Sequence, residues 1–282
     1  MRIGLTGATG TLGRRLTGAL CRGGSSVLPF AGDVRDYVTV REWVDSLDAV
    51  VHAAAIVPVR TVAARLDEAI AVNVAGTANV ALAVADTPRC HLTYLSTSHV
   101  YAPSEIPLAE DALTKPVSLY GMTKLQGEEW VRLLAPESLI VRVFSFCDTR
   151  QQPPFLVPSL CRRIGDAAAN AVLDLHGADK ERDLAGSNWI AERCAVLVRQ
   201  GNAGTVNCGT GTGHTVLEVA RMLSRSFGRG DITWRPADAR RGDRIVADIS
   251  RLRDWIGVPP PDNLMSEFDD CAAAYRNERA MV

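Results

Sequence analysis

Short apolar runs alternate with longer amphipathic stretches along the first half of the chain. The apolar runs have the length of buried strands and occupy residues 2–6, 26–30, 48–55, 91–96 and 139–143. The stretches between them favour helices, over residues 37–46, 62–86 and 120–134 and from the segment 7–13 to about residue 22. This alternation is typical of a parallel sheet covered by helices on both faces. The pattern therefore predicts an α/β dinucleotide-binding domain with a doubly wound parallel sheet (Rossmann) over residues 1–147.

The pattern changes after residue 147. Three prolines interrupt it, and helices are predicted near 155–168, 189–199, 215–227 and 263–279, with short strands near 171–175, 205–208 and 231–235. A chain of 282 residues is long for one compact unit. We therefore expect a smaller, mixed α/β substrate domain over residues 148–282, and the pattern allows one strand–helix unit to return to the first domain.

A glycine-rich segment joins the first strand to the first helix. It reads Gly-Ala-Thr-Gly-Thr-Leu-Gly at 7–13. Glycines at this spacing let the backbone turn tightly and approach a diphosphate, which binds the amide groups at the start of the helix. We therefore predict a dinucleotide-binding loop whose residues are Gly7, Thr9, Gly10, Thr11, Leu12 and Gly13. The alternative is a glycine-rich turn without a ligand.

The end of the second strand bears on the choice of cofactor. It reads Leu-Pro-Phe at 28–30, without the carboxylate that commonly holds the adenine ribose. No acid there repels a 2′-phosphate, and Arg14, Arg15 or Arg35 could meet one. The expected cofactor is NADP or NAD, with NADP slightly favoured. Asp33, the nearest acid, is expected to contact the adenine side or to cap the following helix.

The third strand and the helix after it hold further candidates for the cofactor site. Ala53, Ala54 and Ala55 end the strand, and their small side chains would let a cofactor lie close. His52 is as well explained by a satisfied core position as by a function. Asn73 is polar on a largely apolar helix face, and a buried amide must find partners. It could bind neighbouring backbone or orient a water in the active site.

A tyrosine and a lysine four residues apart open the helix at 120–134. Tyr120 and Lys124 would share one helix face, and an ammonium close to a phenol lowers the phenol pKa toward neutrality. A proton donor to a reducible carbonyl needs such a pKa. Thr97 follows the strand at 91–96, at the carboxyl edge where ligands bind. An ordinary surface pair is the alternative for Tyr120 and Lys124.

Composition narrows the partners and the compartment. A net charge of −1 and a pI near 6.5 give no general basic field for nucleic acid or an anionic membrane. We expect no apolar run of membrane-spanning length, and the N-terminus lacks a signal-peptide pattern. The seven cysteines are scattered and form no Cys-x-x-Cys pair, which indicates reduced thiols rather than disulfides or a metal site. The expectation is a cytoplasmic protein without a bound metal.

Taken together, the motifs resemble the extended short-chain dehydrogenase/reductase family, the epimerases, dehydratases and reductases of nucleotide-sugar metabolism. The resemblance covers nearly the whole chain and rests on the order and spacing of its segments. Those segments are 7–13 (GATGTLG), 32–36 (GDVRD), 50–55 (VVHAAA), 73–80 (NVAGTANV), 96–101 (STSHVY), 120–124 (YGMTK), 176–183 (HGADKERD) and 240–243 (RRGD).

The resemblance implies roles for the best-matched residues. Thr97 matches the residue that hydrogen-bonds the substrate oxygen, Tyr120 matches the acid/base tyrosine, and Lys124 matches the lysine that holds the nicotinamide ribose and tunes the tyrosine. Asp33 and Val34 match the pair beside the adenine.

The substrate side of the resemblance is less complete. Arg182, Arg240 and Asp243 match positions that contact the diphosphate and nucleoside of a nucleotide sugar, and a solvated salt bridge is the alternative for the two arginines. Phe-Cys-Asp at 146–148 replaces the usual Tyr-Gly, and Asn-Trp at 188–189 replaces the usual acidic pair. The implied partner is a nucleotide-diphospho-sugar, and family members often form homodimers through the Tyr/Lys helix.

His99 occupies a slot that faces the sugar in this family and bears on the reaction. Sugar 4,6-dehydratases carry Thr-Asp-Glu at 97–99, whereas here Ser98 and His99 follow Thr97, which disfavours dehydration. His99 could carry a proton or donate a hydrogen bond to a sugar hydroxyl. The short connection before Asp33 resembles dTDP-4-dehydrorhamnose reductases, so reduction of a nucleotide-linked 4-keto-6-deoxy sugar is the leading hypothesis. A nucleotide-sugar 4-epimerase with tightly bound NAD is the alternative, followed by a non-enzymatic NAD(P)-binding regulator.

Overall fold

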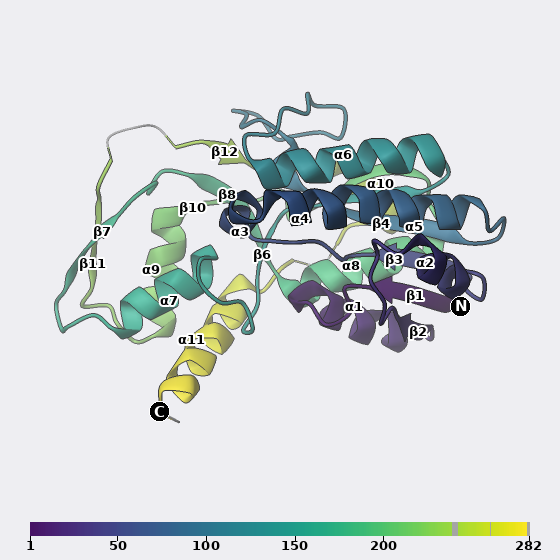
Figure 1. The fold of residues 1–282 in the computed structure, drawn as a ribbon. Coiled ribbons are helices and arrows are strands. Elements are labelled where there is room, and N and C mark those ends of the chain that lie inside the picture. The colour runs from purple at the N-terminus through teal and green to yellow at the C-terminus, as the bar shows by residue number, and fades with distance from the viewer. Residues whose placement is uncertain (239–241, 260, 281–282) are drawn as a thin grey trace.

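The computed structural model describes residues 1–238, 242–259 and 261–280. Its largest sheet has six parallel strands in the order β2-β1-β3-β4-β5-β9, with helices on both sides (Figure 1). The strands are β1 (Arg2–Thr6), β2 (Ser26–Pro29), β3 (Ala49–His52), β4 (His91–Thr97), β5 (Leu139–Val143) and β9 (Gly204–Cys208). The doubly wound parallel sheet predicted from the sequence is therefore confirmed.

Both faces of this sheet are buried, which explains the continuous apolar runs. Val51 and Leu95 enter a core shared with α1, α8 and α10, whereas Val50 and Tyr94 enter a separate core shared with α2, α5 and α6. Successive side chains of a strand point to opposite faces, so every position must be apolar or satisfied. The helices are α1 (Thr11–Arg22), α2 (Tyr37–Val44), α5 (Gly76–Ala85), α6 (Leu119–Leu134), α8 (Ser187–Gln200) and α10 (Ser250–Ile256).

The helix predicted over 62–86 is divided in the structure. It consists of α3 (Val59–Ala64), α4 (Leu66–Ile70), the π-helical turn η1 (Ala71–Ala75) and α5. By length and composition alone, the stretch Leu66–Ala85 could cross a membrane, so the expectation that no apolar run reaches that length is wrong by this criterion. The stretch nevertheless packs along α6 and α2 in the fold, and Ala69, Val80 and Val84 are among its side chains that contribute to the buried interior.

Most of the chain after β5 forms a second layer beside the large sheet. β8 (Glu181–Gly186) pairs with β6 (Ser145–Cys147), β10 (Gly213–Thr215) and β12 (Arg244–Ile245), and β7 (Val172–Leu175) pairs with β11 (Thr233–Pro236). The helices α7 (Leu156–Gly165), α9 (Val216–Ser226) and α11 (Leu264–Ala280) share a separate apolar core with these strands. α8 and β9 return to the large sheet, where β9 pairs with β5. The division into two domains at residue 147 stays a prediction.

The order of strands reverses at β1, which lies between β2 and β3. Ligands of doubly wound sheets bind outside the carboxyl ends of the strands at such a point. Gly7 follows β1 there with a φ of +69°, and a Cβ on Gly7 would lie 2.7 Å from the Ala54 amide nitrogen. The glycine loop and the end of β3 therefore approach each other as closely as backbone allows, which fixes one side of the candidate site.

Candidate active site

Thr97, His99 and Tyr120 meet at the carboxyl end of β4. The Thr97 hydroxyl accepts a hydrogen bond from the His99 amide at 3.3 Å and so begins the short 3₁₀ turn η2 (Ser98–Val100). Tyr120 lies in the first turn of α6, and its phenol lies close enough to the Thr97 side chain for that hydroxyl to lower the phenol pKa. The rings of His99 and Tyr120 meet edge-on, with their centroids 5.6 Å apart. Three of the four residues predicted to be catalytic are thus in contact.

The protonation of Tyr120 differs from the sequence prediction. Burial of the phenol raises the pKa of Tyr120 to about 12, and the Thr97 side chain is a smaller influence in the opposite direction. The prediction that Lys124 brings the Tyr120 pKa toward neutrality is therefore wrong for this structure, because desolvation dominates. A protonated phenol is the form that can give a proton to a substrate oxygen.

Lys124 lies one turn further along α6 and is almost completely buried. Its Nζ lies 4.1 Å from the centroid of the Tyr94 ring, a cation–π contact within the core. Burial lowers the pKa of Lys124 to about 7, and the Glu128 carboxylate acts in the opposite direction. The charge on Lys124 near neutral pH is therefore set by the groups packed around it.

The glycine loop has the features of a diphosphate site. Gly10 begins α1 without a side-chain cap, and the first turn of α1 carries no acidic residue. A Cβ on Gly13 would lie 2.1 Å from the Gly7 carbonyl oxygen, so the turn and the helix can approach only with glycine there. The amides at residues 11–13 begin the helix in this uncapped turn, where the helix dipole favours an anion. Thr9, Thr11 and Leu12 lie in the same loop, and its amide donors fit the diphosphate of a dinucleotide.

The loop after β2 holds the two residues assigned to the adenine side. Val34 is buried against Gly76, where an added Cβ would lie 2.6 Å from Val34 Cγ2. Arg35 donates to the Asp33 carboxylate from its amide and from its guanidinium, each at 2.9 Å, and these bonds lower the pKa of Asp33 to about 2. The capping alternative for Asp33 is wrong, because Asp36 caps α2 by accepting from the amides of Val38 and Thr39.

The three arginines considered for a 2′-phosphate have different hydrogen-bond and ion-pair partners. Arg15 is paired with the buried Asp148 at 2.6 Å, and Arg35 is paired with Asp33. Arg14 donates from Nε to the Thr9 carbonyl oxygen at 2.9 Å and lies beside the glycine loop. Arg14 and Arg35 therefore remain the candidates at the exposed adenine end, whereas Arg15 serves the packing of α1 on the second layer.

Asn73 and His52 belong to one buried network at the carboxyl end of β3. Asn73 accepts from the Ile56 amide at 2.7 Å and donates to the Ile56 carbonyl oxygen at 3.2 Å and to Thr123 Oγ1 at 3.1 Å. The backbone alternative for Asn73 thus agrees with the structure, and the amide fixes the loop after Ala55 against α6. His52 is satisfied on both ring nitrogens, by Thr6 at 2.7 Å and Thr77 at 3.0 Å.

Two of the predicted substrate residues, Arg182 and Asp243, lie near His99. Arg182 on β8 donates to the Asp243 carboxylate at 2.8 Å and to its carbonyl oxygen at 3.0 Å. Desolvation lowers the pKa of His99, Arg182 lowers it further, and Asp243 opposes both effects, so the pair lies within electrostatic reach of His99. The salt bridge considered as an alternative is present, and it leaves both side chains half-buried. Arg240 lies outside the described residues.

Glu128 and Arg142 were missed by the sequence reasoning. The Arg142 guanidinium donates to the Glu128 carboxylate at 2.7 Å, and the pair is buried behind Lys124. The signal was available, because Glu128 follows Lys124 by four residues as Lys124 follows Tyr120. Only the structure shows that this face of α6 is buried. Glu128, the third residue of the series, is therefore a charged group in the core.

Comparisons with known proteins agree with this geometry. Residues 1–173 match the model of a family described as the RmlD substrate binding domain. A dTDP-4-dehydrorhamnose reductase of Mycolicibacterium smegmatis is 32% identical over 182 residues, which are 63% of this chain and 55% of that protein. A dTDP-4-keto-6-deoxy-D-glucose reductase of Streptomyces niveus is 30% identical over 266 residues, which are 88% of this chain and 85% of that protein.

A relative of a different activity and a solved structure complete the comparison. A UDP-glucose 4-epimerase of Azospirillum brasilense is 30% identical over 203 residues, which are 61% of this chain and 57% of that protein. The structure of RMD from Pseudomonas aeruginosa complexed with NADPH superposes with a TM-score of 0.86 at 21% identity, covering 98% of this chain and 99% of that one. The matches to the Mycolicibacterium reductase and to the epimerase thus span little more than half the length of those relatives.

Proposed function

The chain belongs to the RmlD substrate-binding family of extended short-chain dehydrogenases/reductases, and on that basis we propose that it is an NAD(P)H-dependent reductase of a nucleotide-linked 4-keto-6-deoxy sugar. The observation that carries the proposal is the meeting of Thr97, His99 and Tyr120 at the carboxyl end of β4, the edge of the sheet at which the glycine loop also follows β1. The two relatives named as dTDP-sugar reductases support the substrate class.

The side chains divide the work of such a reduction among them. When bound, the nicotinamide cofactor would supply a hydride to the ketone carbon. Tyr120 is protonated and would donate its proton to the ketone oxygen, while the Thr97 hydroxyl hydrogen-bonds and orients that oxygen. Lys124 would hold the nicotinamide ribose through its ammonium, and Asn73 keeps the loop after β3 in place. Together these groups position the carbonyl and provide the proton, and the transfer leaves a phenolate on Tyr120 that must be reprotonated before the next turnover.

His99 and the Arg182–Asp243 pair are proposed to bind the sugar and its diphosphate. The lowered pKa of His99 makes the neutral imidazole the dominant form at pH 7, which favours a hydrogen-bond donor to a sugar hydroxyl over a standing proton carrier. The Arg182 guanidinium is held by Asp243 and its side chain is 24% exposed, so it can bind a diphosphate oxygen on its open side. Arg240 belongs to the same proposed substrate group.

We propose NADPH as the preferred cofactor, with NADH as the second choice. The binding residues are Gly7, Thr9, Gly10, Thr11, Leu12 and Gly13 at the diphosphate, Asp33 and Val34 at the adenine, and Ala53, Ala54, Ala55, Asn73 and Lys124 along the nicotinamide half. Support comes from β2, which ends without a carboxylate, and from Arg14 beside the glycine loop and Arg35 in the loop after β2. The NADPH complex of the structural neighbour from Pseudomonas aeruginosa is consistent with this preference.

The proposal is tested by following absorbance at 340 nm. Purified protein mixed with NADPH or NADH and a dTDP- or GDP-linked 4-keto-6-deoxyhexose should oxidise the cofactor and release it. Tyr120→Phe removes the proton donor and should lower kcat by about 10²- to 10⁴-fold with little change in cofactor affinity. Absence of oxidation with every one of these sugars would overturn the proposal.

The epimerase alternative predicts a different outcome in the same preparation. A nucleotide-sugar 4-epimerase would retain NAD through purification and would convert its substrate without a net change in absorbance at 340 nm. The similarity to the Azospirillum epimerase supports this alternative. Mass spectrometry of the denatured protein identifies any retained cofactor and separates the two reactions. Unchanged function in Tyr120→Phe would instead support a non-enzymatic NAD(P)-binding regulator.

We further propose that the protein acts in the cytoplasm as a homodimer. Its seven cysteines are all free thiols, as expected of a reducing compartment. α6 exposes an apolar stripe at Leu119, Met122, Trp130 and Leu133, and the neighbouring helix α4 exposes Leu66 and Ile70. An apolar face spread over two packed helices is a typical dimer contact.

A further inference from the structure

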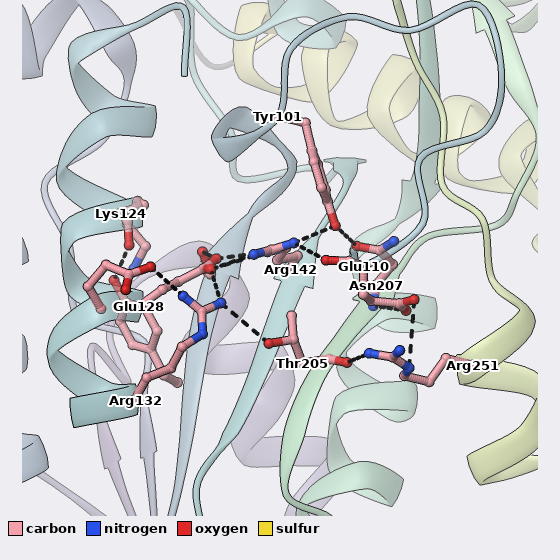
Figure 2. A network of polar contacts seen from close by, with 12 residues as sticks. Tyr101, Glu110, Lys124, Glu128, Arg132, Arg142, Thr205, Asn207 and Arg251 are labelled. Atoms are coloured by element: carbon pink, nitrogen blue, oxygen red, sulfur yellow. Dashed lines mark hydrogen bonds and ion pairs between the residues drawn. The ribbon is translucent and has the colours of Figure 1, made fainter. Parts of the chain in front are cut away.

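One face of α6 carries an ionisable side chain at every fourth position: Tyr120, Lys124, Glu128 and Arg132. Residues four apart lie above one another on a helix, so these groups form a single row. Lys124 and Glu128 are buried, while Arg132 reaches the surface and is 37% exposed. Figure 2 shows Lys124, Glu128 and Arg132 along α6, with Arg142 reaching toward them from the sheet.

The Glu128 carboxylate is held from three elements at once. Ser96 Oγ donates to Oε1 at 2.5 Å from β4, and Arg132 donates to Oε2 at 2.7 Å from α6 itself. Arg142 on β5 donates to Oε1 from Nε at 3.0 Å and to Oε2 from its terminal nitrogen at 2.7 Å, a bidentate contact. These bonds lower the pKa of Glu128 against the opposing effect of burial, so the side chain is a fixed anion in the core.

This anion connects the catalytic face of α6 to the strand that carries Thr97. Ser96 immediately precedes Thr97, so the bond from Ser96 to Glu128 fixes the end of β4 against α6 two turns from Tyr120. The network continues from Arg142 to the Tyr101 hydroxyl at 2.7 Å and from that hydroxyl to Asn207 at 2.8 Å (Figure 2). The register of Tyr120 and Lys124 relative to Thr97 is thus set by contacts that cross three strands.

The charges around Lys124 make Glu128 its main electrostatic support. β3 contributes His52, which is neutral, and β4 contributes the Tyr94 ring, whose own pKa is raised by burial. α6 contributes Tyr120, also neutral, and Glu128, whose carboxylate favours the charged form of Lys124. η1, which packs against α6, contributes the uncharged amide of Asn73. A buried ammonium without an anion nearby loses its proton, so Lys124 depends on Glu128 to remain charged.

We propose that Glu128 is a positioning residue that keeps the Lys124 ammonium charged and holds it, with Tyr120, in register with Thr97. The inference rests on the proposed function only in assigning Lys124 to the cofactor. Neutralising Glu128 removes an attraction and also leaves the buried Arg142 cation uncompensated, and both changes disfavour a second cation at Lys124.

The chain allows a direct measurement, because it contains only three lysines: Lys115, Lys124 and Lys180. Protein labelled with [6-13C]lysine gives one NMR signal for each, and Lys115→Arg and Lys180→Arg assign them. In the wild type, Lys124 is expected to titrate with a pKa of about 7. In Glu128→Gln the Lys124 signal should titrate at least about one pH unit lower. NADPH affinity, measured by fluorescence, should fall off at correspondingly lower pH in this variant.

A neighbouring residue provides the matched control. Glu129→Gln changes the net charge equally on the same helix, but Glu129 is exposed and pairs with Arg132 at the surface, so the Lys124 titration should not move. Arg132→Gln removes a cation from the exposed side of Glu128 and should shift the Lys124 titration upward. This variant also tests the proposal if Glu128→Gln does not fold.

The outcomes that overturn the inference are distinct from a failure of the proposed reaction. An unchanged Lys124 titration in folded Glu128→Gln, or a downward or absent shift in Arg132→Gln, would remove the role assigned to Glu128. The NMR titration uses neither cofactor nor substrate. The role of Glu128 can therefore be tested even if the protein reduces no keto sugar. Reduction of a keto sugar would in turn not count as support for that role.

Discussion

At the residue scale, His52 shows how burial and hydrogen bonding fix a protonation state. The Thr77 hydroxyl donates to the Asn73 carbonyl oxygen at 2.7 Å, so it must accept from His52 Nε2. Thr6 Oγ1 accepts from the amides of Ala53 and Ala54 at 3.1 Å and therefore gives its hydrogen to His52 Nδ1. Only the neutral ring satisfies both partners. Burial, together with the nearby Lys124, lowers the pKa of His52 to about 3.

This neutral histidine predicts a specific loss of stability in acid. The unfolded chain takes up a proton on His52 near pH 6.5, whereas the folded chain resists until about pH 3, so the unfolded state binds more protons between these values. The free energy of unfolding should therefore fall by about 2 kcal/mol between pH 7 and pH 5 from His52 alone. Urea unfolding of the wild type and of His52→Gln at both pH values measures it. An equal loss in the two proteins would exclude His52 as its source.

At the element scale, the loop between β1 and α1 depends on how closely its backbone packs. Gly13→Ala would place a methyl carbon 2.1 Å from the Gly7 carbonyl oxygen and 2.9 Å from Ala8 Cα. Both atoms belong to the main chain, so no side-chain rotation can relieve the clash. We expect a loss of about 1–3 kcal/mol in the free energy of unfolding and weaker NADPH binding, because the turn and the helix must separate.

A second glycine on the same helix is the control. Gly18 lies in the middle of α1, and an added Cβ would meet only the tip of the Arg22 side chain at 3.3 Å. Gly18→Ala should leave NADPH binding unchanged and raise stability by about 0.5–1 kcal/mol through helix propensity. Thermal unfolding and NADPH fluorescence titration compare the two variants. Equal NADPH affinity in both would show that the loop tolerates a side chain at position 13.

The elements of the large sheet could be predicted from the sequence, and most of the second layer could not. β1, β3 and β5 are short apolar runs with the length of buried strands. The glycine spacing of the 7–13 segment predicts the turn between β1 and α1. β12 has two residues, Arg244 and Ile245, and pairs with residues 181–182 more than sixty positions earlier. Such a strand has no periodicity of its own, because its partner rather than its sequence determines it.

The candidate site divides in the same way. Spacing identified Tyr120, Lys124 and Thr97, since their relation depends on one helix and one strand end. The pKa of Tyr120 could not be predicted, because it depends on burial by residues distant in sequence. Glu128 was overlooked for a related reason: a helix with Glu129 and Arg132 beside it looks solvated until the sheet is placed against it.

At the scale of the whole molecule, the helices over the large sheet leave an apolar surface exposed to solvent among the residues that the structure describes. α6 runs alongside α4 and α5, which follow one another along one line (Figure 1), and the outer side of α6 presents Met122, Trp130 and Leu133 to solvent. Leu133 is 72% exposed. The opposite side of the same helix carries Tyr120 and Lys124, so a contact along this surface would stiffen the helix on which the chemistry depends.

The proposed homodimer makes this surface testable. Leu133→Glu places a carboxylate in the middle of an apolar contact, where its desolvation would not be compensated, and should convert a dimer into a monomer. Leu113→Glu is the control. Leu113 is 77% exposed on the loop before α6, so this variant introduces the same carboxylate outside the apolar stripe of α6. Sedimentation equilibrium of the three proteins gives their masses. A wild type that sediments at 30.3 kDa, or a Leu133→Glu variant that remains twice that mass, would contradict a dimer through α6.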